Sequence, residues 1–172
     1  MAEVSENKNI LLKDSAYGRQ ARFSKDRSFI IDSDGNRVEY DDPRIVVVEP
    51  SSRNFYGKKL VEHFYKTKNR KIRIAGDTTP ETIQYSKKIC SGAECLASVG
   101  IAGATLKDLF ENRDENEITL IRNTMNQHGP CQNGNWPLLW KNFSERLDKK
   151  NVIFAVAPSK LNNYFGNGLK FA

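Results

Sequence analysis

This chain has few of the residues that usually reveal a protein's chemistry. Only three cysteines and two histidines occur among its 172 residues, which argues against a disulfide scaffold and against paired C-x-x-C zinc motifs. No apolar run approaches the roughly 18 residues that span a bilayer, and the polar segment Met1–Lys13 has no hydrophobic signal core. We therefore expect a cytoplasmic protein that does not enter a membrane and keeps its thiols reduced.

Nucleotide-binding signatures are also missing. No P-loop sequence occurs, and Gly166-Asn167-Gly168 lacks the full dinucleotide fingerprint, so a turn explains it better. The net charge is +6, and part of it lies in the basic stretch, residues 66–73. Because no aromatic stacking pattern accompanies this stretch, it predicts a helix end followed by a strand, and we do not expect nucleic-acid binding.

The composition changes along the chain. Residues 1–26 are polar and lack sustained periodicity, which predicts a flexible tail. Residues 27–172 have the length of a single domain. This domain is predicted to begin with a short hairpin, because Asp34-Gly35 is a strong turn signal between two short apolar runs.

Beyond residue 44, predicted strands and helices alternate. The β-branched run Ile45–Val48 is typical of a strand buried on both faces. Hydrophobic spacing predicts further strands over 71–75, 117–122 and 152–157, and helices over 56–68, 79–89, 96–111 and 136–149. This order predicts an α/β, Rossmann-like fold with a mostly parallel sheet and helices on both faces.

All three cysteines lie in glycine-containing segments between predicted elements. Cys90 and Cys95 enclose Ser-Gly-Ala-Glu, and Cys131 follows Gly129-Pro130 after the predicted strand 117–122. Ligands of open α/β sheets bind beyond the carboxyl ends of the strands. Thiolates presented there suit an iron–sulfur cluster, so Cys95, Cys131 and Cys90 are candidate metal ligands.

Other interpretations of these segments remain open. The three thiols could be small buried hydrophobic groups, and Cys90 with Cys95 could form a redox pair on oxidation. His128 could be a fourth ligand or could activate Cys131 as a nucleophile. His63 lies among core-like residues of a predicted helix, where a structural role is expected.

Three segments resemble a known family. They are Cys90–Cys95, Gly129–Gln132 and Asn162–Phe171. Together they resemble the domain found in proteins related to the activator of 2-hydroxyacyl-CoA dehydratases, which is itself similar to the dehydratase subunits and to double-cubane-cluster proteins. The aromatic segment Asn54–Phe64 also takes part, and the resemblance covers roughly residues 43–172.

This resemblance implies a [4Fe-4S] cluster held by Cys95 and Cys131, with Cys90 as a less regular match. It implies a part in ATP-driven, low-potential electron transfer, with other domains or subunits of a dehydratase- or reductase-like system as partners. The family's ATP-binding activator domain has no counterpart in the sequence, so we expect a piece of a larger protein or a reduced relative that does not hydrolyse ATP. The alternative is a non-catalytic Rossmann-like module that binds a protein partner or an anionic ligand through its basic face.

Overall fold

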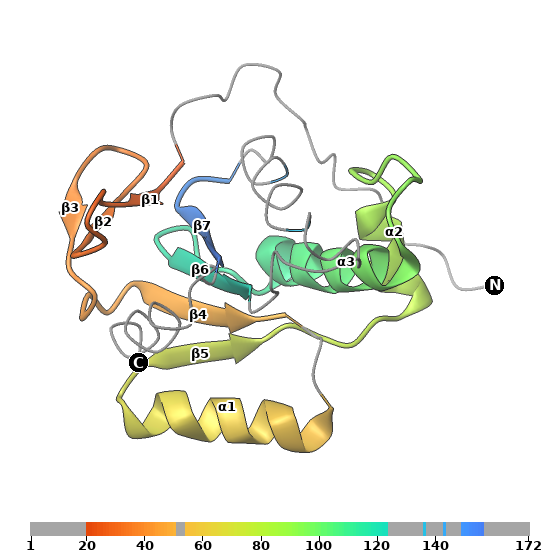
Figure 1. Cartoon of the computed structure of the whole chain (residues 1–172), viewed down its shortest axis with the longest axis horizontal. Coiled ribbons are helices and arrows are strands. Elements are labelled where there is room, and N and C mark those ends of the chain that lie inside the picture. Colours follow the sequence, from red (N-terminus) through yellow and green to blue (C-terminus); the bar gives the residue numbers. More distant parts are fainter. Residues whose placement is uncertain (1–19, 51–53, 124–135, 137–142, 144–148, 157–172) are drawn as a thin grey trace.

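The parallel sheet is the centre of the molecule (Figure 1). The structure is a computed structural model that describes residues 20–50, 54–123, 136, 143 and 149–156. Its elements in chain order are β1 (Arg22–Phe23), β2 (Ile30–Ile31), β3 (Arg37–Val38), β4 (Ile45–Glu49), α1 (Phe55–Thr67), β5 (Lys71–Ile74), α2 (Pro80–Ser86), α3 (Leu96–Glu111), β6 (Ile118–Asn123) and β7 (Val152–Val156). None of the described helices is long and apolar enough to cross a membrane.

The central sheet has four strands in the order β5-β4-β6-β7. All neighbouring strands are parallel, and Val47 of β4 lies between Ile72 of β5 and Leu120 of β6. Leu120 in turn pairs with Ile153 of β7. The β-branched runs form these strands because branched side chains pack well on a pleated, buried surface. The predicted α/β, Rossmann-like fold is confirmed.

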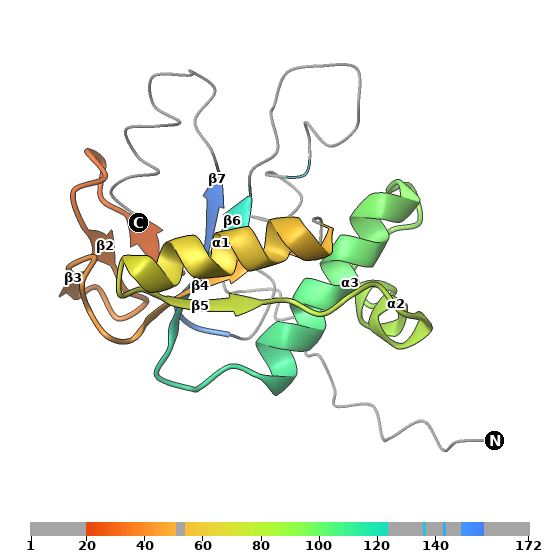
Figure 2. The same cartoon turned by 90° about the horizontal axis from the view of Figure 1, so that it is seen from below.

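Helices cover the two faces of this sheet (Figures 1 and 2). Helix α1 connects β4 to β5 and packs mainly on β5 among the described elements. Helices α2 and α3 connect β5 to β6, and Leu106 and Leu109 of α3 form a buried cluster with Val48, Ile121 and Val152 of the strands. Because β5 and β6 flank β4 on opposite sides, right-handed crossovers place α1 and α3 on opposite faces.

The helix starts follow the sequence closely. Thr79 caps α2 by accepting a hydrogen bond from the backbone N–H of Thr82, whose hydroxyl in turn accepts one from the Thr79 N–H. Pro80 occupies the first helical turn, where its missing N–H costs nothing. Asn54 caps α1 by accepting from the Gly57 N–H at 2.8 Å. Such reciprocal caps satisfy backbone donors that would otherwise lack partners.

A small antiparallel sheet precedes the parallel one, in the order β1-β2-β3. The predicted hairpin is its β2-β3 pair, and Asp32 closes the turn by accepting hydrogen bonds from the backbone N–H groups of Asp34 and Asn36. The predicted tail of residues 1–26 is too long, because Arg22–Phe23 adds β1 to β2 and Ala21 is buried. Two residues are too few for a periodic signal, so the sequence pattern missed this strand. Residues 1–19 lie outside the described residues.

The small sheet is fixed to the parallel sheet by polar and apolar contacts. The Ser33 N–H donates to the side-chain oxygen of Asn151 at 2.8 Å, and the Asn151 N–H donates to the Ser33 hydroxyl at 2.7 Å. Ile30 and Val38 share a buried cluster with Ile153 and other strand residues. The two sheets therefore pack as one unit.

Candidate metal centre

The carboxyl edge of the parallel sheet lies beside the start of α3, which carries one of the candidate cysteines. Helix α3 runs antiparallel to the strands and leads into β6. Its N-terminal end, with Cys95 as the N-cap, therefore lies at the end of the sheet where the strands finish (Figure 1). Strand β6 ends at Asn123, eight residues before Cys131. The start of α3, with Cys95, and the end of β6 therefore both lie at the edge at which parallel sheets bind ligands.

The loop from Cys90 to Cys95 is held by one carboxylate. Glu94 accepts hydrogen bonds from the Ser91 N–H at 3.1 Å, the Ser91 hydroxyl at 3.1 Å and the Gly92 N–H at 3.0 Å. Gly92 has a φ of 92°, a left-handed conformation that suits glycine. Burial alone would raise the pKa of Glu94, but these hydrogen bonds hold that pKa below its usual value. A charged Glu94 thus shapes the loop.

Cys95 occupies the N-cap position of α3. Its side chain makes no capping hydrogen bond, and its thiol is free and half-buried. Caps are usually Ser, Thr, Asp or Asn, because their oxygens satisfy the first backbone N–H groups. The positive end of the helix at this position favours negative charge. A cysteine here leaves both its sulfur and the helix end available to a ligand.

Trp136 packs near the first cysteine segment. Trp136 and Ala102 of α3 are buried together, and Cys95 packs against their cluster. Trp136 lies five residues after Cys131, and five extended residues reach at most about 18 Å. Trp136 itself packs beside the helix start that carries Cys95.

Ser98 has a buried hydroxyl in the first turn of α3. The residue is 0% exposed, and its hydroxyl has no hydrogen-bond partner among the described residues. Residues three apart on a helix share one face, so Ser98 and Cys95 lie on the same side of the helix start. An unsatisfied buried hydroxyl costs about 1–3 kcal/mol. Such a group in a native protein calls for an explanation, and a bound ligand is one.

Cys90 differs from Cys95 in its surroundings. Its side chain packs against the buried cluster of α3 and the strands. Burial and the negative charge of Glu94 raise the pKa of the Cys90 thiol to about 11. A metal ion would have to displace a strongly held proton from this thiol. As candidate ligands, Cys95 fits an iron–sulfur cluster well and Cys90 fits it poorly.

Several sequence candidates lie outside the described residues. They are Cys131, His128 and Gly166-Asn167-Gly168. His63 lies on α1 but is exposed, so the expected place beside the core is wrong. Within the described ranges, no group of three His, Cys, Asp or Glu side chains could hold a metal ion. Those ranges contain Cys90 and Cys95, and a three-thiolate site needs Cys131 as well.

The basic stretch is largely engaged within the protein. As predicted, it is a helix end followed by the strand β5. The Arg73 guanidinium pairs with Asp108 at 2.8 Å and with Glu117 at 2.8 Å, and both carboxylates are almost fully buried. Arg73 therefore joins β5 to α3 and to the start of β6, and it is not presented to an external anion.

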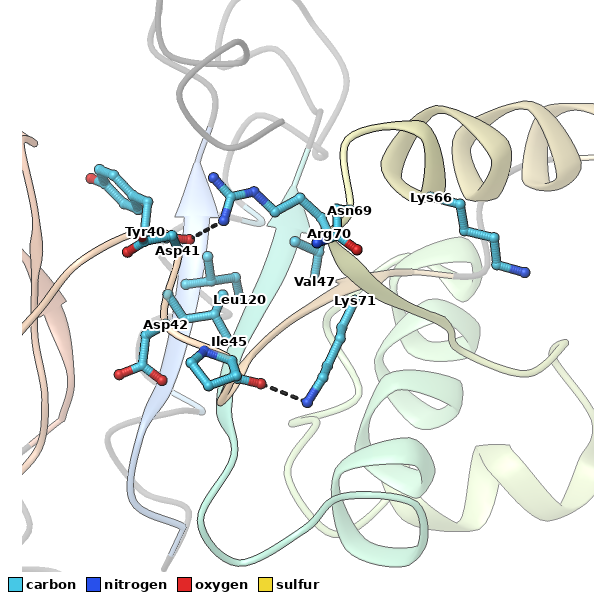
Figure 3. Close-up of a pocket in the computed structure, with 11 residues that line it drawn as sticks. Tyr40, Asp41, Asp42, Ile45, Val47, Lys66, Asn69, Arg70, Lys71 and Leu120 are labelled. Atoms are coloured by element: carbon cyan, nitrogen blue, oxygen red, sulfur yellow. Dashed lines mark hydrogen bonds between the residues drawn. The ribbon is translucent and has the colours of Figure 1, made fainter.

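A pocket of about 340 Å³ lies beside the segment that precedes β4 and the turn between α1 and β5 (Figure 3). Ile45, Val47 and Leu120 form its apolar part. Arg70 donates to the Tyr40 carbonyl at 2.6 Å, and Lys71 donates to the carbonyl of Pro43 at 2.6 Å. Because these cations bind main-chain oxygens, they fasten the segment before β4 to β5.

A buried ion pair at the carboxyl edge was not foreseen from the sequence. Glu49 ends β4 and is 1% exposed, and its carboxylate accepts a hydrogen bond from Arg122 of β6 at 3.0 Å. The pair bridges the neighbouring strands β4 and β6 at the carboxyl edge. In the sequence, a carboxylate at the end of an apolar run is the local sign that Glu49 is paired. Only the pairing of the strands identifies Arg122 as its partner.

Comparison of the chain with protein-family models, with curated proteins and with solved structures found no match.

Proposed function

We propose that this chain is an iron–sulfur domain that takes part in low-potential electron transfer within a dehydratase- or reductase-like system. In this proposal Cys95 and Cys131 hold a [4Fe-4S] cluster at the carboxyl edge, with Cys90 as the candidate third ligand. The family resemblance of the cysteine segments motivates the assignment. Its partners would be other domains or subunits of that system.

The observation that carries the proposal is the packing of Cys95 against the Ala102–Trp136 cluster. It brings the helix start that bears one cysteine next to the chain segment that follows another. The free thiol of Cys95 and the buried hydroxyl of Ser98 lie on the same side of this helix start. A thiolate ligand and a hydrogen-bond donor on one face suit an anionic, sulfur-rich group.

The residues have separate roles in this proposal. Cys95 would supply a thiolate at the positive end of α3, where the helix stabilises negative charge. Ser98 would donate a hydrogen bond to a sulfur, and Trp136 would exclude water from one side. The Glu94 carboxylate would keep the loop closed through its hydrogen bonds to Ser91 and Gly92. When bound, a cluster supplies one-electron transfer, with a potential set by charge, hydrogen bonds and exposure.

The test is anaerobic reconstitution with iron and sulfide, followed by metal and sulfide analysis and electron paramagnetic resonance of the reduced protein. We expect a bound cluster in the full chain, and loss of most of its iron in Cys95→Ser and in Cys131→Ser. Because Cys90 fits poorly, Cys90→Ser should retain more iron than either. A colourless protein after reconstitution would refute the proposal, and so would equal iron in all three variants and the parent.

Ser98→Ala provides a second measurement on the same site. Without a cluster, this variant should be more stable than the parent by about 1 kcal/mol, because an unsatisfied buried hydroxyl is removed. With the cluster bound, it should have a lower reduction potential, because a hydrogen bond to sulfur is lost. An unchanged potential would remove Ser98 from the site while leaving the assignment of the cysteines intact.

The alternative, an anionic-ligand module that uses its basic face, has less support. Arg70, Lys71 and Arg73 of the basic stretch all contact groups within the protein. Salt-dependent binding of nucleotide or nucleic acid that survives replacement of all three cysteines would favour this alternative.

A further inference from the structure

Helix α1 carries a row of exposed apolar side chains. Tyr56 is 81% exposed, Leu60 70% and Phe64 41%. These residues are four apart, so they form one stripe along the helix, which we term the α1 stripe. Among the described residues, the large exposed apolar side chains are those of the stripe, Phe55 and Leu96. Four of these five lie on one helix, so the exposure is concentrated and not scattered.

The stripe is not the side on which α1 packs against the sheet. Tyr65 is the buried residue of α1, and the helix contacts mainly β5 among the described elements. Figures 1 and 2 show α1 along β5, the edge strand, with α2 and α3 on the other side of the sheet. The apolar side chains of α1 therefore lie on two sides of the helix. One side packs on the sheet, and the other is exposed.

Positive charge borders the stripe. Lys59 and Lys66 both pair with the single carboxylate Glu62, at 3.4 Å and 2.8 Å, so one positive charge is left in excess. Both lysine side chains are about two-thirds exposed. Lys68 is also exposed and lies four residues after Phe64. An apolar stripe with a basic border complements an apolar surface with an acidic border.

We propose that the α1 stripe is a docking surface for an amphipathic helix of a partner protein that carries carboxylates beside its apolar face. Three apolar side chains give a small contact, so the complex is transient, as in many electron-transfer encounters. Electrostatic attraction then sets the rate of encounter and its salt dependence. The inference does not depend on a bound cluster, since every residue in it lies on α1.

The experiment uses the full chain and two fluorescent, stapled helical peptides of about 16 residues, long enough to cover α1. Both carry leucine on one face, and glutamate flanks that face in one peptide and lysine in the other. Fluorescence anisotropy should detect saturable binding of the glutamate peptide and much weaker binding of the lysine peptide. Raising the salt concentration about tenfold should weaken the glutamate complex, because exposed charges are screened.

Leu60→Ser and Leu96→Ser form a matched pair, since both leucines are highly exposed, at 70% and 78%, on different helices. Leu60→Ser should weaken binding of the glutamate peptide by at least about tenfold, and Leu96→Ser should weaken it by less than about twofold. Equal effects of the two substitutions, equal affinity for the two peptides, or no saturable binding would overturn the proposal.

Sedimentation of the same proteins identifies a competing occupant. The proposal expects the parent chain to stay monomeric at the concentrations used for anisotropy. A dimer that is lost in Leu60→Ser and kept in Leu96→Ser would assign the stripe to a second copy of this chain, and would overturn the acidic-helix partner.

Discussion

Two cysteines only five positions apart have different chemistry. Cys90 packs against a buried cluster beside the charge of Glu94, whereas Cys95 begins a helix with a free, half-buried thiol. The sequence presents them as a pair. Their difference comes from which side of the loop meets the hydrophobic core, and residue spacing does not contain that information. Thiol reactivity depends on the thiolate fraction, which the raised pKa of Cys90 keeps small.

Cys90 should therefore be alkylated slowly. With its pKa raised to about 11, only about one thiol in a thousand is ionised near pH 8. We expect iodoacetamide to modify Cys90 in a Cys95→Ser, Cys131→Ser protein far more slowly than an unfolded control, with the rate rising steadily toward pH 10. Mass spectrometry of timed samples measures this. A rate that levels off below about pH 9 would contradict the buried, charge-raised thiol.

At the scale of the element, α2 and α3 pack unusually closely. The glycines of α3 would by themselves weaken the helix, because glycine lowers helix propensity. In the structure, an added Cβ at Gly103 would lie 2.0 Å from the Thr82 carbonyl oxygen, and one at Gly100 would lie 2.8 Å from the Thr78 side chain. Gly103 lets α3 approach the backbone of α2, and Gly100 leaves room for the Thr78 side chain just before α2. Their cost in propensity is offset by packing.

Gly103→Ala should consequently destabilise the protein by about 1–3 kcal/mol, even though alanine is the better helix former. The backbone of α2 cannot give way as a flexible side chain could. For a chain of this size, that corresponds to a fall in Tm of roughly 2–12 °C. Gly76→Ala is the control, since nothing lies within 4 Å of its added Cβ. Thermal unfolding of both variants measures the difference, and equal Tm values would contradict this role of Gly103.

At the scale of the whole molecule, one half-buried arginine joins β5 to α3 and to the segment just before β6. Arg73 of β5 pairs with Asp108 of α3 and with Glu117, just before β6. Burial raises the pKa of Asp108, although Arg73 opposes that shift. A carboxyl group whose pKa is higher in the folded than in the unfolded state binds its proton more tightly in the folded state. Its contribution to stability therefore falls as pH rises from the unfolded-state pKa through the folded-state pKa.

Arg73→Met should cost about 3–5 kcal/mol at neutral pH, because it leaves two buried carboxylates without their cation. Without Arg73, the Asp108 pKa should rise further, so acidification from about pH 7 to pH 5 should restore part of the lost stability relative to the parent.

Urea unfolding at both pH values measures this difference, with Arg37→Met as the control. Arg37 and Glu39 form an exposed pair, with side chains 63% and 54% exposed, and its loss should cost less than about 1 kcal/mol. A cost for Arg73→Met as small as that of Arg37→Met, or one that grows on acidification, would contradict the buried network.

The sequence by itself determined the order of strands and helices in the described core. Branched runs such as Ile45–Val48 and helical spacing over 96–111 are local patterns, and local patterns report backbone conformation. The same order, with the handedness of crossovers, predicted that the start of α3, with Cys95, lies at the carboxyl edge. The two-residue strand Arg22–Phe23 was missed, because so short a segment has no period.

Only the tertiary structure decided how individual side chains are used. It turned Arg73 inward to two carboxylates, buried Ser98, exposed Leu60 and Phe64 on α1, and gave Gly103 its contact with Thr82. Each of these depends on which distant segments meet, and burial sets the strength of charges and hydrogen bonds there. A sequence pattern gives the side of an element on which a residue lies. Packing decides whether that side meets protein or solvent.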